Sequence, residues 1–235
     1  MFQLTRRDAV TGMAAMVAVP LAARARPEGR LLHRDDFRQG IGHWSVEAEA
    51  PARVEAVHGI LEIDAPAGLT LWFRSELQGR VAIDYDVQAV GDGGPHDRVS
   101  DVNCFWMAQD PAAPDGDALA RPRSGRFEEY DDLRTYYVGL GGNANTTTRF
   151  RRYIARRGER PLLPENDRQD AADLLVANRW QHLRLVADGR DIGFFRDGRR
   201  LFAFKDTEPY MRGHFALRTT ASHLRVRNFT VSALA

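Results

Sequence analysis

The chain has 235 residues, enough for one large domain, and 43% of them are hydrophobic, which is enough apolar material for a sizeable core. Its 33 basic and 32 acidic side chains nearly cancel, so we expect no nucleic-acid partner, because phosphate contact needs a basic excess. The single cysteine, Cys104, excludes an intramolecular disulfide and a zinc site built from several cysteines.

The first 25 residues have the pattern of an export signal. The pair Arg6-Arg7 precedes an uncharged run over 9–23, and Ala23-Arg24-Ala25 is a small-residue cleavage pattern. This order is typical of a twin-arginine signal, whereas a buried helix, the alternative, would normally carry a polar face. We therefore expect removal of residues 1–25, a single domain over 26–235, a periplasmic or secreted bacterial protein, and no membrane contact after removal of the signal.

Short apolar or alternating runs, bounded by Gly, Pro, Asp or Asn, predict β-strands throughout the rest of the chain. The dipeptides His58-Gly59, Asp188-Gly189 and Asp197-Gly198 predict tight hairpin turns. Residues 170–176 are the one segment that we expect to form a short helix. The predicted strands are 43–46, 52–57, 60–63, 69–73, 80–90, 102–108, 135–140, 147–154, 180–187, 191–196, 199–204, 213–219 and 224–232.

Short strands with turn signals about every 8–12 residues are typical of an antiparallel sandwich or barrel. The number and spacing of the runs favour an all-β fold, an antiparallel two-sheet β-sandwich of the jelly-roll type. Residues 91–95 and 110–122 are rich in loop formers and are expected to be insertions over one face. The Gly/Asn segment 139–145 precedes no helix, so we interpret it as a tight turn with Asn in left-handed conformations and not as a phosphate loop.

The closing strands carry a family resemblance. The run that begins at Trp180 reads W-x-x-L-x-L-V, and the run over 191–198 reads D-I-G-F-F-R-D-G. Together they resemble the closing strands of concanavalin A-like sandwiches, including the bacterial keto-disaccharide hydrolase-like group. The segments 100–108 and 135–153 resemble an uncharacterised family of exported bacterial concanavalin A-like proteins, whose relatives accompany pectin and rhamnogalacturonan breakdown. The resemblance implies a concanavalin A-like jelly roll with a carbohydrate substrate in a groove of one sheet, and it implies no catalytic residues.

Alternation along the central strands sorts polar side chains onto one face of a sheet. Val102, Cys104, Trp106 and Ala108 form an apolar set, so Asp101 and Asn103, with Phe105 and Met107, should share the opposite face. In the same way, Phe150 should point to the core, and Arg152 is then an inward charge or a strand-end residue. The residues that we expect in the groove as substrate-binding groups are Asp101, Asn103, Asn143, Asn145, Arg149, Arg151 and Tyr153.

The arginine density favours an acidic polysaccharide or oligosaccharide as the partner, because a guanidinium matches a carboxylate with two hydrogen bonds. The alternative is a solvated basic strand and loop over 149–160.

A uronic acid permits β-elimination, in which a base removes the C5 proton and an acid protonates the departing oxygen; tyrosine and histidine can do both. We favour Tyr137 as the acid/base, because Tyr136 shares its face with Val138 and Leu140, although either ring could belong to the core. His214 is a reserve base. A basic tyrosine needs neighbouring cations to stabilise its phenolate, which the arginines would supply.

Two other functions use the same groove. A glycoside hydrolase would need two carboxylates, for which Asp101 with Glu128 or Glu129 are the candidates. A binding module without catalysis is the third hypothesis. The histidines form no HxH or HxxxH cluster, so we expect no transition-metal site and no cofactor. A structural calcium ion stays open, since Asp84 and Asp86 share a strand face, although a solvated edge is the favoured interpretation.

Overall fold

A computed structural model describes residues 29–235, so the predicted export signal lies outside the described part of the chain. Within this part, no helix has both the length and the apolar character that a membrane crossing requires. Strands dominate, and helical structure is limited to single turns. The strands are β1 (Arg30–Asp35), β2 (Trp44–Ala48), β3 (Arg53–Val57), β4 (Ile60–Phe73), β5 (Leu77–Gln78), β6 (Val81–Ala89), β7 (Val102–Gln109), β8 (Arg134–Gly141), β9 (Thr147–Ile154), β10 (Asp167–Arg168), β11 (Gln181–Asp188), β12 (Asp191–Arg196), β13 (Arg199–Lys205) and β14 (Arg212–Ala233). The single turns are η1 (Pro114–Gly116), η2 (Phe127–Tyr130), α1 (Gly142–Asn145), η3 (Pro164–Asn166) and η4 (Ala171–Asp173).

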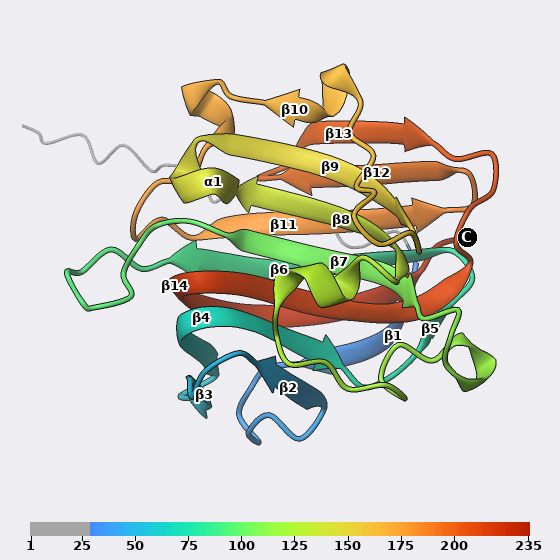
Figure 1. The fold of residues 1–235 in the computed structure, drawn as a ribbon. Helices are drawn as coiled ribbons and strands as arrows, with labels where there is room; N and C mark the ends of the chain where they lie inside the picture. The colour runs from blue at the N-terminus through green and yellow to red at the C-terminus, as the bar shows by residue number, and fades with distance from the viewer. Residues whose placement is uncertain (1–28) are drawn as a thin grey trace, which may run out of the picture.

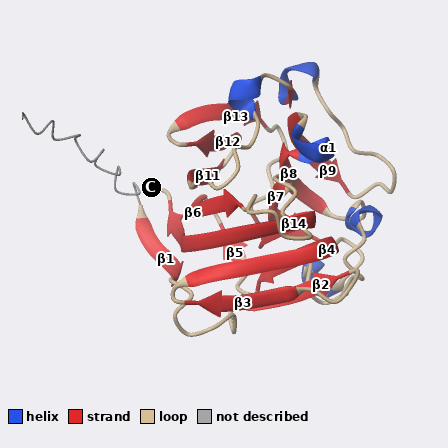
Figure 2. Cartoon of the chain, turned by 90° about the vertical axis from the view of Figure 1, so that its left-hand side faces the viewer, coloured by secondary structure: helices blue, strands red, loops and turns tan. Residues whose placement is uncertain are grey.

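The strands form two antiparallel layers that share β4 and β14 (Figure 1). In the first layer, the order is β10-β9-β8-β7-β14-β4-β2; in the second, it is β13-β12-β11-β6-β14-β4-β3, with β1 beside the end of β14. Figure 2 shows β6, β14, β4 and β3 side by side. The predicted all-β antiparallel two-sheet jelly roll is therefore confirmed.

The two shared strands explain the main differences from the predicted elements. Runs expected as separate strands, 60–63 with 69–73 and 213–219 with 224–232, are each one long strand that passes from one layer to the other. In β14 the passage coincides with a bulge between Thr220 and Ser222, where Ala221 has a left-handed backbone with φ 46°. A run of mixed polarity at such a corner lacks the alternation of a flat strand, so the sequence pattern breaks there.

Other predictions of local structure need smaller corrections. The helix expected over 170–176 is only the single turn η4. His58-Gly59 and Asp197-Gly198 form the expected tight turns, with φ between 51° and 80° at their central residues. The turn predicted at Asp188-Gly189 is centred one residue later, since Asp188 still pairs with Asp191. The strands β1, β5 and β10 were not predicted; two of them have only two residues.

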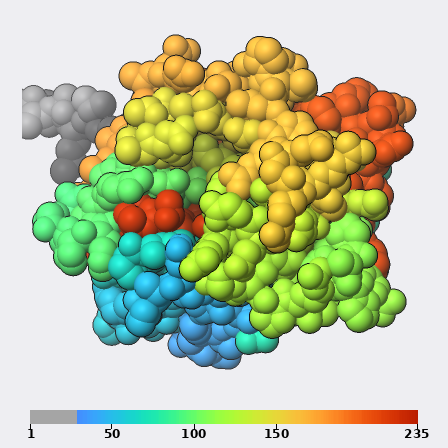
Figure 3. Space-filling view, in the orientation of Figure 1, coloured from blue at the N-terminus to red at the C-terminus, as the bar shows by residue number. Residues whose placement is uncertain are grey.

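The main core fills the space between the layers and contains a group of tightly packed rings, among them Trp44, Phe73, Phe215 and Phe229. A second apolar cluster lies on the outer face of the first layer, where the segment 110–133 folds over the sheet. The insertion predicted over 110–122 is thus the first part of a longer segment that covers one face, as Figure 3 shows in light green. The second cluster consists of Trp72, Phe105, Ala108, Ala118, Tyr130, Leu133, Tyr137, Tyr153 and Ala216.

The buried carboxylate of Glu47 fastens this covering segment to the sheet. It accepts hydrogen bonds from Trp72 Nε1 at 2.8 Å, from the Tyr130 hydroxyl at 2.7 Å and from the Arg123 backbone N–H at 2.8 Å. Because these donors come from β4 and from the covering segment, one side chain fixes where that segment stands on the outer face. The segment in turn forms one wall of the pocket described next.

Candidate functional site

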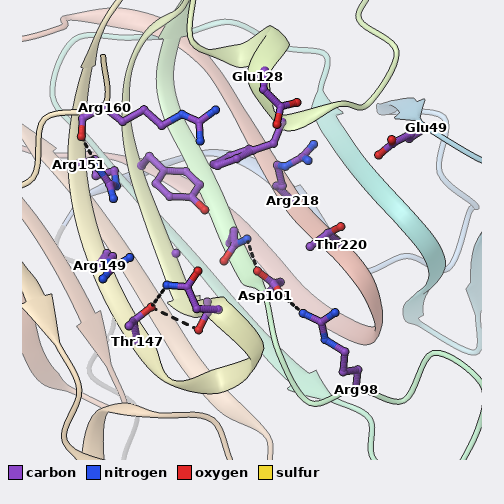
Figure 4. A pocket seen from close by; sticks show the side chains of 16 residues that line it. Glu49, Arg98, Asp101, Glu128, Thr147, Arg149, Arg151, Arg160, Arg218 and Thr220 are labelled. Atoms are coloured by element: carbon purple, nitrogen blue, oxygen red, sulfur yellow. Dashed lines mark hydrogen bonds and ion pairs between the residues drawn. The ribbon is translucent and has the colours of Figure 1, made fainter. Parts of the chain in front are cut away.

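A pocket of about 540 Å³ lies on the outer face of the first layer, beside the covering segment (Figure 4). Strands β7, β8, β9 and β14 form its floor, α1 closes one end, and η2 forms one wall. We call it the outer-face pocket. It is lined by Glu49, Arg98, Asp101, Asn103, Phe127, Glu128, Tyr137, Gly139, Gly142, Asn143, Thr147, Arg149, Arg151, Arg160, Arg218 and Thr220.

The α1 turn is left-handed, as the Gly/Asn pattern predicts: φ is 53° at Asn143 and 61° at Asn145. Gly141 precedes it with a left-handed φ of 67°, and a Cβ there would collide with the Leu175 side chain, so the position favours glycine. The Asn143 amide donates to Thr147 Oγ1 at 3.1 Å and lines the pocket. The Asn145 side chain instead exchanges two hydrogen bonds with the Leu175 backbone, at 2.8 and 3.0 Å, and does not line it.

Two polar residues at the start of β7 reach the pocket. Asn103 donates from Nδ2 to Asp101 Oδ1 at 3.3 Å, and Arg98 donates to Asp101 Oδ2 at 3.4 Å. The expected alternation holds from Asp101 to Phe105 and then fails. Met107 has φ 54° at a register shift, which turns its side chain into the main core and places Ala108 in the outer cluster. The prediction that Met107 shares the groove face is therefore wrong, because a bulge reverses the alternation.

The neighbouring tyrosines of β8 lie on opposite faces. Tyr136 is in the main core, where its hydroxyl donates to Asp206 Oδ2 at 2.7 Å and accepts from the Tyr210 N–H at 3.1 Å. Tyr137 lines the pocket, and its hydroxyl has no hydrogen-bond partner among the described residues. Its ring lies over Gly139, where a Cβ would come within 3.0 Å of the hydroxyl oxygen.

The ionisation of Tyr137 differs from the expectation. Burial raises the pKa of its phenol well above the ordinary value, and the charge of Arg218 opposes this only in part. The hydroxyl therefore stays protonated at neutral pH, which suits proton donation and not the phenolate base that the arginines were expected to create.

Some arginines of the pocket are paired with a carboxylate and others are not. Arg149 is held by both carboxylate oxygens of Asp167, at 2.9 and 3.0 Å, and Arg160 by those of Asp131, at 2.6 and 3.2 Å. Arg151 donates only to the backbone oxygen of Arg160, and burial lowers its pKa.

Arg218 has no acidic partner either. It donates to Thr70 Oγ1 at 2.9 Å and to the Gly125 backbone oxygen at 2.8 Å, and its guanidinium lies 4.9 Å from the centre of the Phe127 ring. Within residues 29–235, Arg151 and Arg218 are thus the two guanidinium groups of this pocket that form no ion pair or hydrogen bond with a carboxylate, although the charge of Arg151 helps to lower the pKa of Asp167. Such groups are suited to bind an anion.

Outside the pocket, the basic loop behaves as the alternative interpretation describes. Arg156 faces Glu159 at 3.6 Å and Arg157 faces Asp132 at 3.2 Å, with all four side chains exposed to solvent. Arg152 lies within β9 on the side of Phe150 and Tyr136, so it is the inward charge of the two alternatives, and its guanidinium pairs with the buried Asp206 at 2.7 Å.

Several predicted residues lie away from the pocket. Tyr153 is fully buried in the outer cluster beneath Tyr137, with ring centres 5.5 Å apart. His214 is buried, donates to the Phe73 carbonyl at 3.2 Å and lies 3.1 Å from Asp117. Glu129 accepts hydrogen bonds from Ser124. The structure thus assembles Asp101, Asn103, Glu128, Tyr137, Asn143, Arg149 and Arg151, and it separates them from Glu129, Tyr136, Asn145, Tyr153 and His214.

Arg218 is the most informative residue that sequence analysis missed. In the run G-H-F-A-L-R it shares its alternation with His214 and Ala216, opposite the core residues Phe215 and Leu217. Alternation could therefore have placed it on the outer face. Sequence alone could not show that β14 lies beside β7, where Arg218 pairs with Asn103. No group of three or more His, Cys, Asp or Glu side chains within 29–235 is arranged to hold a metal ion.

Comparison with known families settles the membership of the chain. Residues 63–229 match the model of a domain of unknown function, DUF6250. The chain belongs to the DUF6250 family. No curated protein matches it.

Solved structures share the fold of this DUF6250 chain at low identity. A protein of unknown function with a galectin-like fold from Bacillus subtilis has a TM-score of 0.65 at 18% identity, covering 87% of this chain and 96% of that one. A carbohydrate-binding module from Bacillus subtilis has a TM-score of 0.53 at 11% identity, covering 81% and 96%. An alginate lyase has a TM-score of 0.51 at 10% identity, covering 90% and 100%. These likenesses show the jelly-roll fold.

Proposed function

We propose that this DUF6250 chain is a carbohydrate-active protein whose outer-face pocket binds an anionic saccharide. The observation that carries the proposal is the pair of guanidinium groups, Arg151 and Arg218, that line the pocket and form no ion pair with any described carboxylate. The rings of Tyr137 and Phe127 offer apolar surface to sugar C–H groups, and Asn103 and Asn143 offer amides to hydroxyls. The fold is shared with a carbohydrate-binding module and an alginate lyase, which agrees with such a ligand.

The reaction that fits these groups best is β-elimination from a uronic acid. A guanidinium bound to the sugar carboxylate would make the C5 proton easier to remove. Asp101 is the candidate base, since Asn103 and Arg98 hold its carboxylate and its charge is near enough to raise the pKa of Tyr137. The C5–H electrons form the C4=C5 double bond, the C4–O bond breaks, and the Tyr137 hydroxyl gives its proton to the departing oxygen. Solvent then restores both side chains.

The test is incubation with polygalacturonate and alginate while the ultraviolet absorbance of the new C4=C5 double bond is recorded. Arg151→Met should raise the KM for the polymer about tenfold, because it removes a charged hydrogen-bond donor to the carboxylate. Arg200→Met is the matched control, since the Arg200 side chain is exposed on β13 and makes no hydrogen bond or ion pair with any described residue. Equal KM values for the two variants would refute the assignment of Arg151.

A glycoside hydrolase is the second candidate, because Glu49, Asp101 and Glu128 bring three carboxylates to the same pocket. Hydrolysis produces new reducing ends without a double bond, so the two reactions differ in their products. Binding of the polymer with neither product would identify a binding module.

Export remains a separate proposal, supported by the sequence pattern of residues 1–25 alone. Expression in a bacterium with a twin-arginine pathway, followed by N-terminal sequencing of the protein from the periplasm, tests it. A mature chain that begins at Arg26 is expected, and a protein that stays in the cytoplasm with Met1 intact contradicts it.

A further inference from the structure

The start of β8, the end of β9 and the β13–β14 connection meet at one end of the sandwich (Figure 1). Residues of these segments line a second pocket of about 700 Å³. We call it the end pocket. None of its lining residues belongs to the outer-face pocket. Its lining contains four arginines and one carboxylate, although three of these arginines also pair with carboxylates outside the lining: Arg152 with Asp206, Arg156 with Glu159 and Arg212 with Glu76. The lining residues are Gln109, Arg134, Arg152, Ile154, Arg156, Glu208, Pro209, Tyr210, Met211 and Arg212.

The floor of the end pocket is held in place by buried contacts. Arg152 donates to Asp206 Oδ2 at 2.7 Å and to the Glu208 backbone oxygen at 2.8 Å, and its guanidinium lies 4.4 Å from the centre of the Tyr210 ring. The Tyr210 hydroxyl donates to the Tyr153 backbone oxygen at 2.7 Å. A ligand would thus meet a floor that needs no rearrangement, which lowers the entropic cost of binding.

The rim, in contrast, carries two arginine side chains that take part in no buried ion pair. The Arg134 side chain is exposed and makes no hydrogen bond or ion pair with any described residue. Arg156 has only the exposed Glu159 at 3.6 Å, a contact that contributes little in water. Both guanidinium groups can therefore turn toward an anionic ligand without breaking a buried interaction.

The rest of the lining matches a saccharide better than a bare anion. Pro209 and the exposed Met211 present apolar surface for sugar C–H groups, and the exposed Glu208 side chain can accept from sugar hydroxyls. A nucleic-acid site would instead be expected to carry a larger basic excess and open aromatic rings for stacking, whereas one face of Tyr210 is covered by Arg152.

A third, smaller hollow along β9 shares lining residues with each of the two pockets. Arg151 lines both the outer-face pocket and a small apolar hollow of about 160 Å³, and Arg152 and Ile154 line both that hollow and the end pocket. From Arg149 to Ile154 the strand advances about 17 Å, which is longer than one sugar ring. A chain of several sugars could therefore follow the strand from one pocket to the other.

We infer that the end pocket is a second binding site for an acidic polysaccharide, which holds the part of the chain that extends beyond the outer-face pocket. The inference takes its ligand class from the proposed function but not its reaction. It requires that long anionic chains bind more tightly than short ones, and that Arg134 and Arg156 account for the difference.

The experiment is calorimetric titration of the full-length protein with long polygalacturonate and with a galacturonate trisaccharide. Arg134→Gln/Arg156→Gln should weaken binding of the long polymer about tenfold at low salt and leave trisaccharide binding unchanged. The control is Arg34→Gln/Arg200→Gln, which removes equal charge from exposed arginines of β1 and β13. Neutral dextran and single-stranded DNA complete the set of probes.

Four results would overturn the inference. Two concern the polymer: the wild-type protein does not bind long polygalacturonate, or the Arg134/Arg156 variant binds it as tightly as the wild type does. The other two concern the controls: the Arg34/Arg200 variant loses as much affinity as the Arg134/Arg156 variant, or the wild type binds dextran or single-stranded DNA as tightly as polygalacturonate. All these measurements report binding, so they do not depend on the absorbance assay that tests the proposed reaction. A protein that binds the long polymer through Arg134 and Arg156 yet forms no double bond refutes β-elimination and supports the end pocket.

Discussion

The adjacent residues Tyr136 and Tyr137 on β8 allow a test of the proposed general acid. The Tyr136 hydroxyl is hydrogen-bonded inside the protein, whereas Tyr137 lines the outer-face pocket. Tyr137→Phe removes a hydroxyl without a hydrogen-bond partner among the described residues, while the ring keeps its contact with Phe105, whose centre is 5.0 Å away. The free energy of unfolding should therefore change by less than about 1 kcal/mol. Turnover should fall by about 10²- to 10⁴-fold, the usual contribution of a general acid.

Tyr136→Phe is the matched control with the opposite expectation. Its hydroxyl donates to Asp206 at 2.7 Å and accepts from the Tyr210 N–H at 3.1 Å, so both partners lose a hydrogen bond inside the protein. Loss of a hydrogen bond to a charged group lowers the free energy of unfolding by about 1.5–3 kcal/mol. Turnover should stay at the wild-type level, because this ring lies on the core side of the sheet.

The measurements are urea denaturation followed by tryptophan fluorescence, and turnover of polygalacturonate at a temperature where both variants are folded. Wild-type turnover in Tyr137→Phe would remove this residue from the chemistry. A large loss of stability in the same variant would mean that its hydroxyl has a structural partner. Equal loss of turnover in folded Tyr136→Phe would refute the separation of the two faces.

Three further variants and reagents test the physical argument elsewhere. Glu47→Gln should lower the free energy of unfolding by about 2 kcal/mol or more, measured by urea denaturation, because an amide cannot accept from the donors on both carboxylate oxygens. Hydrogen bonds to Asp84 and then Asp86 raise the pKa of His182 to about 9, above the ordinary 6.5. The stability that it contributes is complete below pH 6.5 and is lost as pH rises toward 9, so the difference in unfolding free energy between wild type and His182→Asn should shrink over that interval. Burial raises the pKa of Cys104 to about 12, so a thiol reagent should leave the native protein unmodified near neutral pH and react fully after denaturation; reaction of the native protein would contradict its burial.

Alternation of side chains predicts most of the strands and the face on which each residue lies, because a half-buried strand must repeat every two residues. It places Tyr137 and Arg151 on the outer face and Phe150 in the core, as the structure has them. It cannot show what covers a face. Tyr153 was expected in the groove on the same grounds, yet the covering segment and Tyr137 bury it completely.

β-Bulges are a second reason why alternation in the sequence does not predict every side-chain position. A single residue with a left-handed backbone, such as Met107 or Ala221, moves every following side chain to the other face. Neither residue is a glycine or an asparagine, the types whose presence usually signals such a conformation. The corner at Ala221 also allows β14 to serve both layers, so the sequence pattern shows two strands where the fold has one.

The charge of the pocket depends on partners that lie far away in sequence. Six arginines between Arg149 and Arg160 predict a basic groove, but Asp167 and Asp131 neutralise Arg149 and Arg160, and Arg152 belongs to the other face. Arg151 alone of that group reaches the outer-face pocket without an ion pair to any described carboxylate, and Arg218 joins it from β14. Composition gives only the number of charged residues. Which of them remain available to a ligand depends on the residues that the fold places beside them. The proposal of an anionic ligand therefore depends on two specific guanidinium groups and not on the arginine density that first suggested it.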